Sequence, residues 1–188
     1  NLKDDGYLVK VIPDRQWVEL SKKVKIFCIT THIQDSVLLI DVNGTLFVDL
    51  NDAGINRCGR LIRSISKNYN HIYLLSLAGW GDADMINFYD EDGNFIEPLS
   101  ANKPLVGRQL SIIAKAIGAN KIIPFSSFHR YQREDSVWAN NYITPIEAYS
   151  KGVDDDLEYI RPFVTIDCNT QEKSYYELTP TIPIIKSP

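Results

Sequence analysis

Residues 36–50 read Ser-Val-Leu-Leu-Ile-Asp-Val-Asn-Gly-Thr-Leu-Phe-Val-Asp-Leu, two β-rich runs joined by Asn43 and Gly44. Asn-Gly is the strongest short signal for a β-hairpin, because both central positions of a type I′ turn need a positive φ, which these two residues tolerate. The sequence therefore predicts a hairpin with strands over 36–42 and 45–50.

Strands and helices alternate on either side of this hairpin. Runs rich in β-branched and aromatic residues predict strands, and apolar residues at intervals of three and four predict amphipathic helices. The expected strands cover 7–12, 24–31, 71–77, 121–125 and 163–168, and the expected helices cover 58–69 and 106–117, the second ended by Gly118. This order predicts an α/β fold in which helices flank a mixed sheet.

The composition excludes several classes of protein. The 188 residues are 44% hydrophobic, which is enough for a packed core, and the net charge of −4 argues against a general nucleic-acid or membrane-surface binder. No apolar run reaches the ~18 residues needed to span a bilayer. Three cysteines without a C-x-x-C pair disfavour a disulfide scaffold and a zinc ribbon, so we expect a cytoplasmic protein.

Three polar residues follow predicted strands and are candidates for a site. His32 follows the strand over 24–31, Asp52 follows the hairpin, and His129 follows the strand over 121–125. Residues at strand ends often gather at one edge of an α/β sheet, and two imidazoles with a carboxylate suit zinc, iron or manganese. Each also has a structural interpretation, as a strand-end histidine or a turn aspartate.

The spacing of these residues resembles a known family. His32-Ile33-Gln34-Asp35-Ser36 is followed by the hairpin and then by Asn51-Asp52, with Asp52 20 residues after His32. This order resembles the second half of the metallo-β-lactamase superfamily. In that family a helix, a buried strand, a further helix and a short strand then deliver the last metal-binding histidine, as 121–125 delivers His129 here. Leu50-Asn51-Asp52 and the long 76–98 segment look most like the branch of ascorbate-phosphate lactonases and CMP-N-acetylneuraminate hydroxylase.

The resemblance implies a site and a reaction. His32 and His129 would each ligate a metal, and Asp52 would bridge one or two divalent ions, zinc in the first place and iron or manganese otherwise. Asp52 is then the catalytic carboxylate, and a metal-bound hydroxide would hydrolyse an ester, a lactone or a phosphorylated small molecule. Asp35 competes for a ligand role, although a hydrogen bond within the loop or to a ligating imidazole is the preferred interpretation.

The chain departs from the family in one major respect. The His-x-His-x-Asp-His motif of the family's first half is absent, and the only methionine is Met85. We therefore expect residues 1–188 to be a single domain or the C-terminal half of a longer chain, with an N-terminal strand and connector over 1–23, a motif-bearing α/β core over 24–150 and a C-terminal extension over 151–188.

The expected fold is half of a four-layer αβ/βα sandwich. Its sheet would expose an apolar face to a missing half or a partner chain, with a homo-oligomer as another possibility. The alternative function is a non-catalytic binding or scaffold module, or an oxygenase-associated domain, with an incomplete metal site.

The segment 126–144 is rich in side chains that bind anions and rings. Arg130 and Arg133 are candidates for clamping a phosphate or carboxylate, and Tyr131 and Trp138 for walling a substrate pocket. The alternative is a helix with surface ion pairs and core aromatics.

Overall fold

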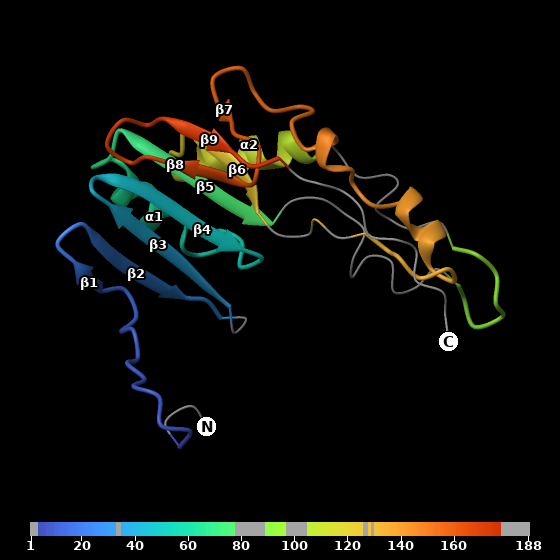
Figure 1. Cartoon of the computed structure of the whole chain (residues 1–188), viewed down its shortest axis with the longest axis horizontal. Helices are drawn as coiled ribbons and strands as arrows, with labels where there is room; N and C mark the ends of the chain where they lie inside the picture. The colour runs from blue at the N-terminus through green and yellow to red at the C-terminus, as the bar shows by residue number, and fades with distance from the viewer. Residues whose placement is uncertain are drawn as a thin grey trace.

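The structure, a computed structural model, describes residues 4–32, 35–77, 89–96, 105–125, 128 and 130–177 (Figure 1). In chain order its elements are β1 (Trp17–Ser21), β2 (Val24–Thr30), β3 (Ser36–Val42), β4 (Thr45–Asn51), α1 (Gly59–Ser66), β5 (His71–Leu77), α2 (Val106–Ile117), β6 (Lys121–Phe125), the 3₁₀ helices η3 (Val137–Asn141) and η4 (Ile146–Ala148), β7 (Glu158–Tyr159), β8 (Val164–Ile166) and β9 (Lys173–Tyr175).

Seven strands form one mixed sheet whose spatial order equals the chain order, β1 to β7. The strands β1 to β4 are antiparallel, and β4 to β7 are parallel. The predicted hairpin is confirmed as β3 and β4, and its turn residues Asn43 and Gly44 have φ values of 52° and 84°. The parallel half needs crossover connections, and these carry α1 and α2.

Both α-helices contribute to the main hydrophobic core on one face of the sheet. Alternate residues of β4, namely Leu46, Val48 and Leu50, are fully buried in this core. Ile62 of α1 and Ala114 of α2 belong to the same core. Helix α2 ends at Gly118, whose left-handed φ of 80° confirms the predicted glycine stop.

A second, two-stranded sheet of β8 and β9 lies over the opposite face of β5 and β6 (Figure 1). A smaller core of Tyr73, Ile123 and Ile160 packs there with Val164 and Ile166 of β8. The main sheet is therefore covered by helices on one face and, over its parallel half, by a short hairpin on the other.

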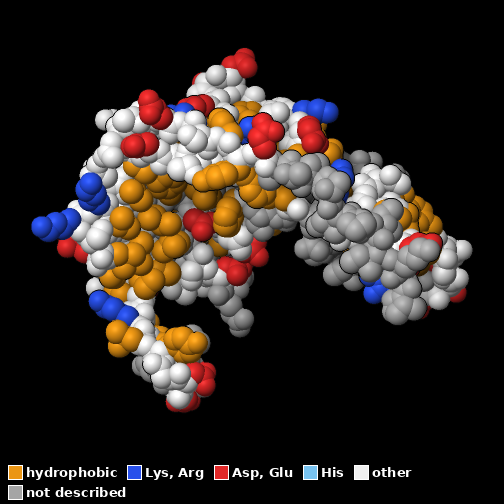
Figure 2. Space-filling view, viewed as in Figure 1, with side chains coloured by type: hydrophobic (Ala, Val, Ile, Leu, Met, Phe, Trp, Pro, Cys, Tyr) orange, Lys and Arg blue, Asp and Glu red, His pale blue; other side chains and the backbone are white. Residues whose placement is uncertain are grey.

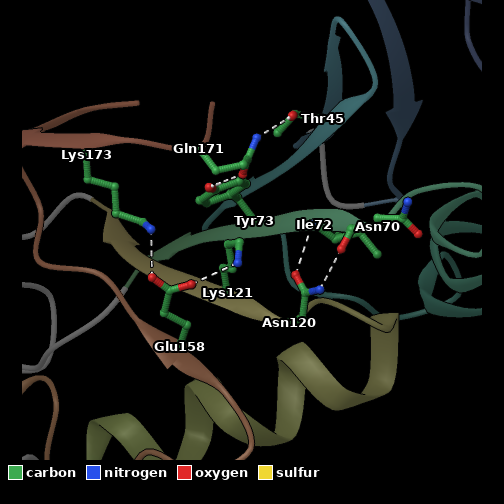
Figure 3. Close-up of polar contacts among 9 residues, drawn as sticks. All are labelled: Thr45, Asn70, Ile72, Tyr73, Asn120, Lys121, Glu158, Gln171 and Lys173. Atoms are coloured by element: carbon green, nitrogen blue, oxygen red, sulfur yellow. Dashed lines mark hydrogen bonds and ion pairs between the residues drawn. The ribbon is translucent and has the colours of Figure 1, made fainter. Parts of the chain in front are cut away.

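Polar contacts tie this second sheet to the main one (Figure 3). The Tyr73 hydroxyl donates to Gln171 Oε1 at 2.7 Å, and Gln171 Nε2 donates to the Thr45 hydroxyl at 3.0 Å. Glu158 pairs with both Lys121 and Lys173 at 2.8 Å. Burial alone would raise the pKa of Glu158, but the two lysines hold it below its ordinary value.

The same face is open over β2, β3 and the neighbouring part of β4. Figure 2 shows hydrophobic side chains gathered there, with an acidic group among them. By strand alternation and register this open face carries Val24, Cys28, Leu38, Ile40 and Val42, all half-buried. Leu20 of β1, which is 61% exposed, extends the apolar surface onto the outermost strand of the sheet.

Three predictions of local structure need correction. Residues 7–12 form no strand, and Leu8 is fully exposed, because nothing in the described chain pairs with this run. The edge strand is β1, which the sequence analysis missed. Helix α1 covers only Gly59–Ser66 within the predicted 58–69, and β8 only Val164–Ile166 within 163–168.

Candidate functional site

Four strands end at the same edge of the main sheet. Strands β2 and β4 both run antiparallel to β3, and β5 and β6 run parallel to β4, so all four point the same way. Their carboxyl ends point toward the segment that carries η3 and η4 (Figure 1). Such an edge is where open α/β sheets bind ligands.

His32 and Asp52 both lie at this edge and are exposed. Two strand spacings separate β2 from β4, which is about 10 Å. Strand β6 also lies two spacings from β4, on the other side. Strand β4, which leads to Asp52, is therefore midway between β2, which leads to His32, and β6, which leads to His129. His129 itself lies outside the described residues.

The backbone turns sharply where β4 meets Asp52. The pairing of β4 with β5 shifts register between Asp49 and Asn51, and Asn51 takes a positive φ of 44°. The Asn51 side chain donates to Asp52 Oδ1 at 2.7 Å, and the Ala53 N–H donates to the Leu50 carbonyl at 2.8 Å. One oxygen of Asp52 is thus oriented by its neighbour, which leaves the other available to a ligand.

Asp35 has a structural role in the connection between β2 and β3. Its main-chain carbonyl accepts hydrogen bonds from the Thr31 N–H at 2.9 Å and from the Thr31 hydroxyl at 2.8 Å. These hydrogen bonds involve the backbone of Asp35 and do not test the ligand role considered for its carboxylate.

The donor types at the edge fit a borderline divalent metal. Imidazole nitrogen and carboxylate oxygen are ligands of zinc, iron and manganese. Within the described ranges no group of three or more His, Cys, Asp or Glu side chains is close enough to hold an ion. A metal at this edge would therefore need a further donor besides His32 and Asp52, and the sequence predicts His129 as its source.

Three of the four candidate substrate residues, Tyr131, Arg133 and Trp138, take part in local contacts around η3. Arg133 makes a two-bond ion pair with Asp135, at 3.2 and 2.8 Å, and the Trp138 indole N–H donates to the Asp135 carbonyl at 2.8 Å. Tyr131 and Trp138 pack with Ala139. Arg130 is exposed. The structure thus gives Arg133 and Trp138 structural contacts and leaves the Arg130 side chain on the surface.

Asp49 is a carboxylate that the sequence analysis did not single out. Its register partners are Leu38 on β3 and Leu75 on β5, so it lies on the sheet face opposite the helices. Burial raises the pKa of Asp49 above its ordinary value, although a hydrogen bond from the Asn51 N–H at 3.0 Å lowers it in part. Its position could be read from the alternation of β4, in which Leu46, Val48 and Leu50 occupy the other face.

No protein-family model matches this chain, and no curated protein matches it. In the described residues, no helix is long and apolar enough to cross a membrane. The function therefore has to be inferred from the fold and from the residues at the sheet edge.

Proposed function

We propose that this chain carries one side of a metal-dependent hydrolase site of the metallo-β-lactamase type, acting on an ester, a lactone or a phosphorylated small molecule. The observation that carries the proposal is the order of the strand ends. His32 follows β2 and Asp52 follows β4, and β6, the strand that precedes His129 in the chain, is as far from β4 as β2 is.

In this proposal His32, Asp52 and His129 hold one or two divalent metals. A metal bound there would acidify water toward neutral pH and so supply a nucleophile. Asn51 orients the Asp52 carboxylate through its side-chain amide. The turn after β4 places that carboxylate at the end of the strand, beyond the buried part of the sheet.

The open sheet face supports the second part of the proposal, that this fold is half of a four-layer sandwich. An apolar sheet face is usually buried against another layer. We propose that the covering layer is a further part of the same protein or a partner chain, and that it completes the metal site.

A binding module without catalysis is the second candidate, favoured by the same open face. It would use the apolar surface to dock another chain and would not depend on His32 or Asp52. The two candidates differ in whether metal-dependent hydrolysis occurs.

The test is hydrolysis by protein made from the complete gene and supplied with zinc, iron or manganese. Ester, lactone and phosphomonoester substrates are assayed in parallel. Asp52→Asn should lower kcat/KM by at least ~100-fold, since removing even an outer partner of a ligand costs 10- to 100-fold. Asp155→Asn, the same chemical change at an exposed site, should leave the rate unchanged. Equal rates in the two variants would contradict the assignment of Asp52.

A further inference from the structure

A pocket of about 270 Å³ lies at the carboxyl end of β2, between the segment before β1 and the loop before α1. Its basic lining consists of Arg15, His32 and Arg57, and its neutral polar lining includes Thr30 and Asn56. Three chain segments that are distant in sequence therefore meet around one concave, mostly polar space.

Backbone contacts hold the Arg15 wall of the pocket in place. The Arg15 N–H donates to the Cys28 carbonyl at 2.8 Å, and Asp14 Oδ1 accepts the Thr30 N–H at 2.7 Å. Arg15 is thus attached to β2 just before the start of β1. On the other side Cys58, which also lines the pocket, is buried in the main core and fixes the loop that carries Arg57.

The described lining of the pocket carries a net positive charge, because two arginines face one paired carboxylate. In the part of the chain that the structure describes, its lining contains no aspartate or glutamate. Asp14 pairs with Arg15, with its Oδ2 3.6 Å from Arg15 Nε, so part of one guanidinium charge is offset. Among the described residues, no ion pair or side-chain hydrogen bond is recorded for Arg57. A guanidinium presents its positive charge on a planar fork of N–H donors.

Helix α1 adds to this positive field. The helix begins at Gly59, next to the pocket residue Cys58, and its first turn has neither an acidic residue nor a side-chain cap. No acidic side chain in this first turn therefore offsets the partial positive charge of the helix start. This partial charge adds to the attraction of an anion by the two arginines, which is the larger effect.

We propose that this pocket binds a phosphate group. Two guanidinium forks with neighbouring hydroxyl and amide donors suit the three terminal oxygens of a phosphate or phosphomonoester better than the two oxygens of a carboxylate. His32 belongs both to this pocket and to the proposed metal ligands. If the proposed function holds, the pocket would anchor the phosphate of a phosphorylated substrate beside the reacting bond. Phosphate binding itself does not depend on that function.

The experiment is a titration of the full 188-residue chain with inorganic phosphate, in the presence of a chelator and at constant ionic strength. Binding is followed by amide chemical shifts in nuclear magnetic resonance spectra. We expect saturable binding, with the largest shifts at Thr30, Asn56 and Arg57. Acetate at the same ionic strength should bind at least tenfold more weakly.

Two substitutions locate the binding site. Arg57→Gln should weaken phosphate binding at least tenfold, and Arg57→Lys, which keeps the charge but loses the fork, should weaken it less. Arg108→Gln is the matched control, because Arg108 is exposed on α2 and is not part of the pocket lining. The variants should keep the circular dichroism spectrum of the parent chain.

Three results would overturn the proposal: no saturable binding, equal affinity for acetate, or equal weakening by Arg57→Gln and Arg108→Gln. Because the chelator removes metal, these outcomes are independent of the hydrolysis test. Phosphate binding by the chain, together with no metal-dependent hydrolysis by the protein from the complete gene, would support the pocket and contradict the proposed function. A repeat with phenyl phosphate distinguishes a substrate-type ester, which should bind as well, from a site for free phosphate alone.

Discussion

At the residue scale, Asp49 places a charge on an otherwise apolar sheet face. A carboxylate between leucines on neighbouring strands is partly removed from water, and this raises its pKa, while only the Asn51 N–H compensates. A covering layer would bury the group further. We therefore expect a covering layer to place a hydrogen-bond donor or a cation next to the Asp49 carboxylate.

Asp49→Asn should stabilise the isolated chain at pH 7. The pKa of Asp49 is higher in the folded than in the unfolded state, so its ionised form destabilises the fold, and this penalty disappears as the pH falls below the ordinary value of 3.8. We expect a gain of about 1 kcal/mol at pH 7 that vanishes near pH 3, measured by urea denaturation at both pH values. Asp155→Asn serves as the exposed control. A loss of stability at pH 7 would contradict this interpretation of Asp49.

At the element scale, the sequence predicts most accurately where local chemistry decides the structure. The Asn43-Gly44 turn has the positive φ values that its residues predict, and the apolar run His71–Leu77 is a strand with the predicted bounds. Residues 7–12 have the composition of a strand but no neighbour to pair with, and pairing is a property of the whole fold. Strand β1 was missed because its five residues, WVELS, are interrupted by the charged Glu19 and form no continuous β-rich run, as is typical of a short edge strand.

The same limit applies to the candidate site. The order of strands and helices predicted that His32 and Asp52 follow strands, and the structure places both at one sheet edge. The pocket around Arg15 and Arg57 could not be predicted, because it joins three segments whose approach depends on tertiary packing. Asp49 could have been found from the alternation of β4 alone.

Gly44→Ala should destabilise the chain by about 1 kcal/mol. Gly44 has a φ of 84° with nothing within 4 Å of an added Cβ, so the cost comes from the backbone conformation alone. Gly59→Ala is a matched control, because an added Cβ at this helical position makes only ordinary contacts with Ile55, and it should be neutral or stabilising. Thermal unfolding of both variants checks this. An equal effect of the two substitutions would contradict the role of the turn.

At the scale of the whole molecule, the unequal covering of the two sheet faces is the main feature. The helices cover one face, whereas β8 and β9 cover only the parallel half of the other. An open apolar surface tends to associate with other apolar surfaces. We therefore expect the isolated chain to self-associate at high concentration.

Ile40→Glu should reduce that self-association and leave the fold intact, because Ile40 is half-buried on the open face. Leu39→Glu, one residue earlier, should unfold the chain, since Leu39 is fully buried in the helix-side core. Sedimentation velocity and circular dichroism distinguish these outcomes. Unchanged association in Ile40→Glu would show that the open face is not the contact surface.

The most direct test of the proposed metal site is the metal content of the protein purified from its complete gene, measured by elemental analysis with intact mass. We predict about one to two transition-metal ions per chain. His32→Ala should lose at least one of them, whereas His71→Ala should keep them, because His71 begins β5 at the opposite edge of the sheet. A metal-free parent protein, or equal metal content in the two variants, would contradict the metal site at this sheet edge.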